Sequence, residues 1–196
     1  MRLILTAAAA SLAIVTAACQ KVAEGDPAND MMMNDGAAEE ALANDMNLGA
    51  VPVAPMAATD FASTIAASDM FEIASGKLAQ ARASNAELKS FGGMLIADHG
   101  KSSADLKAAA AASTPPVTLP TAMPAELQAR LDALAAARGA AFDTLFLEQQ
   151  KDGHQKALDA LNSFASTGDA ASLKAFAAKA SPVVQAHLEK LNAIKL

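Results

Sequence analysis

The chain has 196 residues, among them 15 basic and 21 acidic side chains and a single cysteine, Cys19. One cysteine excludes an intramolecular disulfide and a metal site built from several thiolates. Seven acids and one lysine lie between Gln20 and Ala58, so most of the net charge of −6 falls there and the rest is nearly neutral. Without a basic stripe to follow phosphates, the chain is not expected to bind nucleic acid.

Residues 1–18 have the pattern of a secretory signal peptide. Arg2 precedes an apolar stretch from Leu3 to Val15, and the small residues Ala17 and Ala18 mark a cleavage point. The stretch is shorter than the ~20 apolar residues that cross a bilayer. We therefore expect these residues to be removed and the chain to be exported to the cell envelope.

Cys19 directly follows Ala17 and Ala18 and so resembles the lipobox of bacterial lipoproteins, whose cysteine becomes the lipidated first residue. The resemblance implies a lipid anchor that makes the membrane a partner. Because the residue after the cysteine, Gln20, is not aspartate, the resemblance also implies transfer of the lipoprotein to the outer membrane. Cleavage after Ala18 with release of a periplasmic protein is the alternative.

Residues 19–58 are predicted to form an acidic, flexible linker. The segment is rich in Ala, Asp, Glu, Asn, Gly and Pro, has no aromatic residue and shows no sustained periodicity. The run Met31–Met33 contains thioethers, which are ligands for cuprous copper. It lacks a repeated ligand spacing, so a solvated linker is the favoured interpretation.

Residues 59–196 are predicted to form one all-α domain. Apolar residues recur at helical intervals over about 60–84, 86–112 and 124–138, then from Gly139 to Gly168 and from Asp169 to about 194. Asn85 is a suitable N-cap, and Pro115 ends the second segment. Pro182 is expected to kink the last helix without stopping it, because the apolar register continues beyond it. Four long amphipathic segments predict an antiparallel four-helix bundle.

Each of the three histidines lies on a different long helix, and the first helix supplies Glu72. His99, His154, His187 and Glu72 fall on apolar stripes and should point inward. Counted from the connecting turns, Glu72 and His99 face each other, and His154 and His187 form a second pair offset by roughly 7 Å. Two further acids are expected to give interior polar support, namely Asp98 beside His99 and Asp143 about three turns from His154.

One carboxylate and three imidazoles are suitable ligands for one divalent transition metal, such as zinc, iron, manganese or copper. Di-iron bundles instead use Glu-x-x-His, and Ile96, Lys151 and Val184 stand three residues before the histidines here. A hydrogen-bonded network without metal is the favoured alternative, because buried polar groups are usually paired structurally. No nucleophile elbow or phosphate-binding loop is present, so no catalytic residue is predicted.

Several segments in order resemble a bacterial family, the domain of unknown function 4142. They are Asp60-Phe61 with Glu72, Met94 to His99, Gly139 to Asp143, His154, and Phe176-Ala177 followed by Pro182 and His187. The resemblance spans roughly 60–195 and implies a ferritin-like bundle in an exported protein, often described as an outer-membrane protein. We expect an envelope protein with a structural or stress-related accessory role. A metal-binding ferritin-like module is the alternative.

Overall fold

The computed structural model describes residues 56–196. The predicted signal peptide, Cys19 and the predicted linker as far as residue 55 lie outside the described residues. Within the described part the chain is all-α, as predicted, and contains no strand. Its helices are α1 (Ala58–Arg82), α2 (Ala86–Ala111), α3 (Ala125–Ala136), α4 (Gly139–Thr167) and α5 (Ala171–Ala193).

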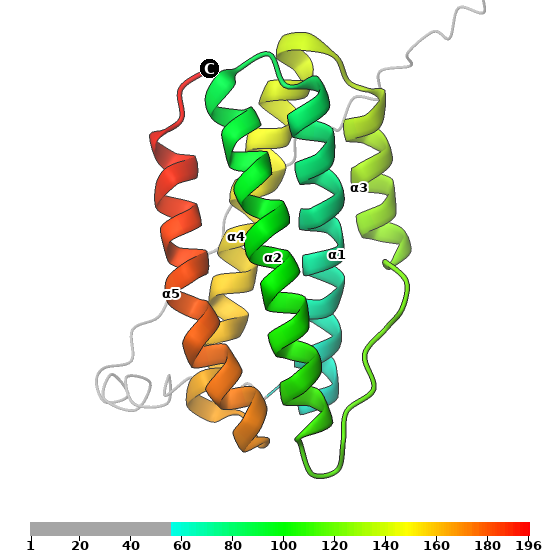
Figure 1. Ribbon diagram of the computed structural model, residues 1–196, viewed down its shortest axis with the longest axis vertical. Helices are drawn as coiled ribbons and strands as arrows, with labels where there is room; N and C mark the ends of the chain where they lie inside the picture. Colours follow the sequence, from blue (N-terminus) through cyan, green and yellow to red (C-terminus); the bar gives the residue numbers. More distant parts are fainter. Residues whose placement is uncertain (1–55) are drawn as a thin grey trace, which may run out of the picture. The chain divides into compact units, whose positions relative to one another are not determined.

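The four long helices α1, α2, α4 and α5 lie side by side as an antiparallel bundle, which confirms the predicted architecture (Figure 1). The shorter α3 packs on the outside of the bundle against α1 (Figure 1). Ala137 and Arg138 separate α3 from α4. Gly139, the first residue of α4, has a φ of 56°, a left-handed conformation that glycine adopts without steric cost. None of the described helices combines the length and the apolar character of a membrane span.

The turn between α1 and α2 is fixed by two polar side chains. Asn85 caps α2 as predicted, because its Oδ1 accepts from the backbone N–H groups of Glu87 (2.8 Å) and Leu88 (3.2 Å). The carboxylate of Asp143 accepts from the backbone N–H groups of Ser84 and Asn85, both at 2.9 Å. Asp143 thus supports this turn at one end of the bundle.

Other helix ends differ from prediction by a few residues. Pro124 is the residue before α3 rather than its first helical residue, and α5 begins at Ala171 rather than Asp169. The last helix continues through Pro182 to Ala193, as the apolar register indicated.

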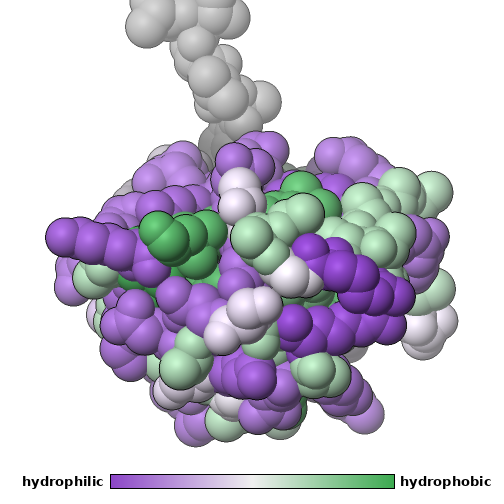
Figure 2. Space-filling model, turned by 90° about the horizontal axis from the view of Figure 1, so that it is seen from above, coloured by the Kyte–Doolittle hydropathy of each residue, from purple (hydrophilic) through white to green (hydrophobic). Residues whose placement is uncertain are grey.

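Two hydrophobic clusters fill the bundle, with a polar layer between them. One cluster contains Phe61 and Phe164, whose rings stack with centroids 4.0 Å apart. The other contains Phe91 and Phe142. In α2, α4 and α5 the buried polar residues of the centre lie between the residues that contribute to the two clusters. In α1 Asp69 lies between them, whereas Glu72 and Ser75 follow Phe71 of the second cluster. Seen from above, one end of the bundle shows mainly hydrophilic side chains with smaller apolar areas (Figure 2).

Candidate metal centre

The three histidines meet in the polar layer. His99 on α2, His154 on α4 and His187 on α5 are exposed by only 7%, 2% and 3%. One ring nitrogen of each lies within 4.8 Å of the corresponding nitrogens of the other two. The prediction that these side chains point inward is confirmed, and the structure brings all three together rather than only one pair.

In each ring, one nitrogen is held by an acceptor outside the group. His99 Nδ1 lies 2.7 Å from Asp69 Oδ1, and His187 Nε2 lies 3.0 Å from Asp98 Oδ2. His154 Nδ1 lies 2.9 Å from the carbonyl oxygen of Gln150. Three hydrogen bonds of this kind fix both the orientation of each ring and the nitrogen that carries its proton.

The nitrogens that remain are His99 Nε2, His154 Nε2 and His187 Nδ1. The last two lie 3.3 Å apart. Because each of these rings carries its proton on the other nitrogen, both nitrogens present lone pairs to the space between them. His99 Nε2 is buried and has no hydrogen-bond partner. Buried polar atoms are rarely left unpaired in folded proteins, so an orphaned nitrogen at the meeting point of two other imidazoles indicates a site for a ligand.

The three imidazoles differ in their affinity for protons. Burial, together with the smaller effect of the nearby charge of His99, lowers the pKa of His154 to about 3. Burial likewise lowers the pKa of His187, against the effect of its hydrogen bond to Asp98. Burial also acts to lower the pKa of His99, but the hydrogen bond to Asp69 and neighbouring carboxylates outweigh it and raise that pKa. His154 and His187 therefore offer free lone pairs, and His99 must release a proton to bind a cation.

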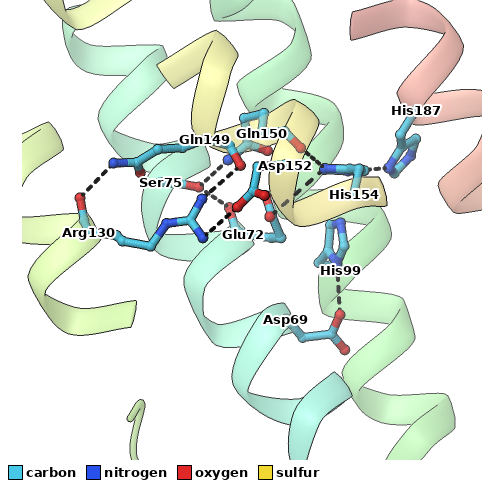
Figure 3. A network of polar contacts seen from close by, with 10 residues as sticks. All are labelled: Asp69, Glu72, Ser75, His99, Arg130, Gln149, Gln150, Asp152, His154 and His187. Carbon is cyan, nitrogen blue, oxygen red and sulfur yellow. Dashed lines mark hydrogen bonds and ion pairs between the residues drawn. The ribbon is translucent and has the colours of Figure 1, made fainter. Parts of the chain in front are cut away.

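Glu72 is buried beside this group but does not belong to it. Its Oε1 lies 4.0 Å from His154 Nδ1, and Glu72 and His187 lie on opposite sides of His154 (Figure 3). Its Oε2 has no hydrogen-bond partner, and burial raises the pKa of this carboxyl to about 7. The structure thus differs from the sequence expectation that Glu72 faces His99 and is a fourth ligand.

Asp69, rather than Glu72 as expected, is the acid that faces His99. The two acids are three residues apart on α1, so both face the interior at levels that differ by less than one turn. Counting residues from the α1–α2 turn does not show which of the two acids faces His99. The signal that could have found Asp69 is its position on the same apolar stripe as Ile65 and Glu72.

The two acids that were expected to give interior polar support, Asp98 and Asp143, differ in what they contact. Asp98 holds His187, although its own side chain is 41% exposed. Asp143 is buried at the α1–α2 turn, where it accepts from two backbone N–H groups, and no hydrogen bond joins it to the histidines. Two interior residues were missed: Gln150, which holds His154 through its carbonyl oxygen, and Ser75, whose hydroxyl accepts from the Gln150 side chain at 3.1 Å.

The converging group consists of three imidazoles and no carboxylate among the described residues. A dinuclear iron site of the ferritin type needs several carboxylates projecting into the bundle core together with histidines, so this donor set does not fit one. Three imidazoles with one further position open match the ligand number of mononuclear zinc sites.

Comparison with curated proteins and with solved structures finds no match. A family model described as a domain of unknown function matches residues 43–194, which include all five helices. The chain therefore belongs to the family of the domain of unknown function DUF4142.

Proposed function

We propose that this protein is a metal-binding module of the bacterial cell envelope, and that His99, His154 and His187 hold one divalent transition metal ion. The observation that carries the proposal is the convergence of three imidazole nitrogens while an acceptor holds the second nitrogen of every ring. Metal-binding histidines almost always donate their other ring N–H in this way.

The distances favour a tetrahedral ion such as zinc. Zinc–nitrogen bonds of about 2.0–2.1 Å place two ligand nitrogens roughly 3.3 Å apart around a tetrahedral centre. His154 Nε2 and His187 Nδ1 already have a separation of 3.3 Å. The remaining nitrogen lies within 4.8 Å of both, so a small movement of the His99 ring completes the site.

The surrounding charges also favour a cation. Asp69 and Asp98 each contact a histidine of the group, and both are acidic. Two carboxylates balance the charge of a divalent ion, which reduces the free-energy cost of burying that charge. Glu72, at 4.0 Å from His154 Nδ1, adds a buried carboxyl group that can bind or release a proton beside the site.

The position in the cell is proposed from the N-terminal sequence. Residues 1–18 have the features of a signal peptide, and Cys19 follows the small residues of a lipobox-like site. A lipid on Cys19 and the acidic segment after it would tether the bundle to the membrane, with the outer membrane as the expected destination. Mass spectrometry of the mature N-terminus tests this, because an unmodified Cys19 in protein isolated from its host contradicts the lipid anchor.

A structural accessory role without metal is the second candidate. The ion pair between His99 and Asp69 connects α2 to α1. The contact between His154 and His187 connects α4 to α5, and it becomes a hydrogen bond when one of the two facing nitrogens carries a proton. In that case the polar layer serves to fix the register of the bundle. The two candidates differ in whether the protein binds a metal at all.

Titration with zinc or cobalt separates them. We expect the purified protein to bind one ion and the His154→Ala variant to lose this binding while keeping its helical circular dichroism. The matched control is Cys19→Ser, which removes the only thiol of the chain and should leave the stoichiometry unchanged. Absence of binding in the wild type, or equal binding by His154→Ala, would overturn the proposal in favour of the structural network.

A further inference from the structure

A cavity of about 200 Å³ opens beside the three histidines. Its lining comes from all four long helices and includes His99 and His187 but not His154. The cavity therefore reaches two of the three rings. It is larger than the apolar cavity of about 150 Å³ that is known to bind benzene in another protein.

The cavity has an apolar wall and a charged rim. Its apolar lining includes Ile65, Leu161, Phe176 and Val184. Lys101 and Lys179 also line it, and both side chains are 66% exposed and pair with Asp105. An apolar passage that leads from solvent to buried imidazoles is suited to a ligand with a hydrocarbon body and a polar head.

The charges of the residues that line the cavity indicate whether the polar head group of the ligand is an anion or a cation. Asp69, Asp98 and Asp105 contribute three negative charges, and Lys101 and Lys179 contribute two positive charges. With the histidines neutral, the lining without metal is therefore net negative by one charge, and a divalent ion at the histidines makes it net positive by one. An anionic head group restores neutrality only when the metal is bound.

From these features we infer that the cavity binds a small amphiphilic anion, of the class of short-chain carboxylates, with its head group on the metal and its chain along the apolar wall. The inference rests on the proposed function, because the histidines supply only three ligands and leave a coordination position for the head group. It adds a ligand class to that function, and with it the role of a carrier or sensor of such anions.

Hexanoate and acetate are the probes, and the cobalt-loaded protein reports binding through its visible spectrum and by calorimetry. The two anions share a carboxylate, and hexanoate is longer by four methylene groups, each of which contributes about fourfold to affinity when fully buried. We expect hexanoate to bind at least about tenfold more tightly than acetate. We also expect neither anion to bind the metal-free protein.

Ala180→Phe tests the location of the chain. Ala180 lines the cavity on α5 and is partly exposed, so a phenyl ring can occupy the cavity from there. This variant should bind cobalt as the wild type does but lose the preference for hexanoate. Ala178→Phe is the matched control, because Ala178 is an exposed residue of the same helix outside the cavity lining, and it should keep the preference.

The outcomes separate this inference from the proposed function. Cobalt binding with equal affinities for the two anions, or an unchanged preference in Ala180→Phe, would refute the carboxylate site and leave the metal site standing. Equal hexanoate binding with and without metal would refute the placement of the head group. Absence of cobalt binding in the wild type would refute both.

Discussion

Replacing Glu72 with glutamine should change how the stability of the metal-free protein depends on pH. Glu72 is 1% exposed, and burial raises the pKa of its carboxyl from 4.5 to about 7. The folded protein thus holds this proton more tightly than the unfolded chain does. Its contribution to stability is complete below pH 4.5 and is lost as the pH rises through about 7.

The size of the effect follows from the pKa difference. One unit of pKa difference corresponds to about 1.4 kcal/mol, so the rise of the Glu72 pKa from 4.5 to about 7 corresponds to about 3 kcal/mol. Glutamine imitates the protonated carboxyl in shape and cannot ionise. We therefore expect the free energy of unfolding of the wild type, relative to Glu72→Gln, to fall by about 3 kcal/mol between about pH 4 and pH 8.

His154 titrates with the opposite sign and must be separated from Glu72. Its pKa is lowered to about 3, so its contribution is present above pH 6.5 and is lost as the pH falls through about 3. Because His154 is present in both proteins, the difference between wild type and Glu72→Gln largely removes its contribution.

Urea unfolding followed by far-ultraviolet circular dichroism measures the difference, with a chelator present to exclude metal. Glu148→Gln is the matched control, because Glu148 is an exposed carboxylate on α4 and its replacement should alter stability little. If the free energy of unfolding of the wild type relative to Glu72→Gln stays constant or grows as the pH rises, the folded protein does not hold the proton of Glu72 more tightly than the unfolded chain does.

Three further predictions concern packing, capping and ligand support. Gly92→Ala should destabilise the fold by about 1–3 kcal/mol in urea unfolding, because the added Cβ would lie 2.7 Å from the backbone oxygen of Gly76. Gly100→Ala, with nothing within 4 Å, should instead stabilise α2 by about 0.5–1 kcal/mol, and equal effects at the two sites would contradict this packing. Asp143→Ala should lower thermal stability by about 1–3 kcal/mol, since two backbone N–H groups lose their acceptor; a melting curve like that of the wild type would disprove this role. Asp98→Asn should weaken zinc binding by about 10- to 100-fold in competition titrations, and unchanged affinity would argue against a carboxylate that orients its ligand.

The helices could be predicted because their signals are local. Asn85 caps α2, and the apolar register continues through Pro182, so the ends of α2 and the continuity of α5 follow from neighbouring residues. The place of Asp143 depends on how the start of α4 meets the α1–α2 turn. That contact joins residues 58 positions apart and leaves no periodic signal in the chain.

The candidate site could be predicted only in part. Apolar periodicity indicated that the three histidines point inward, but it could not fix their heights to better than about one helical turn of 5.4 Å. A metal coordination sphere is smaller than that, with ligand distances near 2 Å. Residue counting therefore could not choose between Asp69 and Glu72 as the partner of His99, and the packed structure selects Asp69 at 2.7 Å.

X-ray absorption spectroscopy of the zinc-loaded protein tests the proposed three-histidine site, because it identifies the atoms bound to the ion. We expect three imidazole nitrogens at about 2.0–2.1 Å and a fourth ligand atom that is oxygen or nitrogen. A sulfur ligand at about 2.3 Å, which Cys19 would supply, or a zinc shell without imidazole scattering would contradict a site built from His99, His154 and His187.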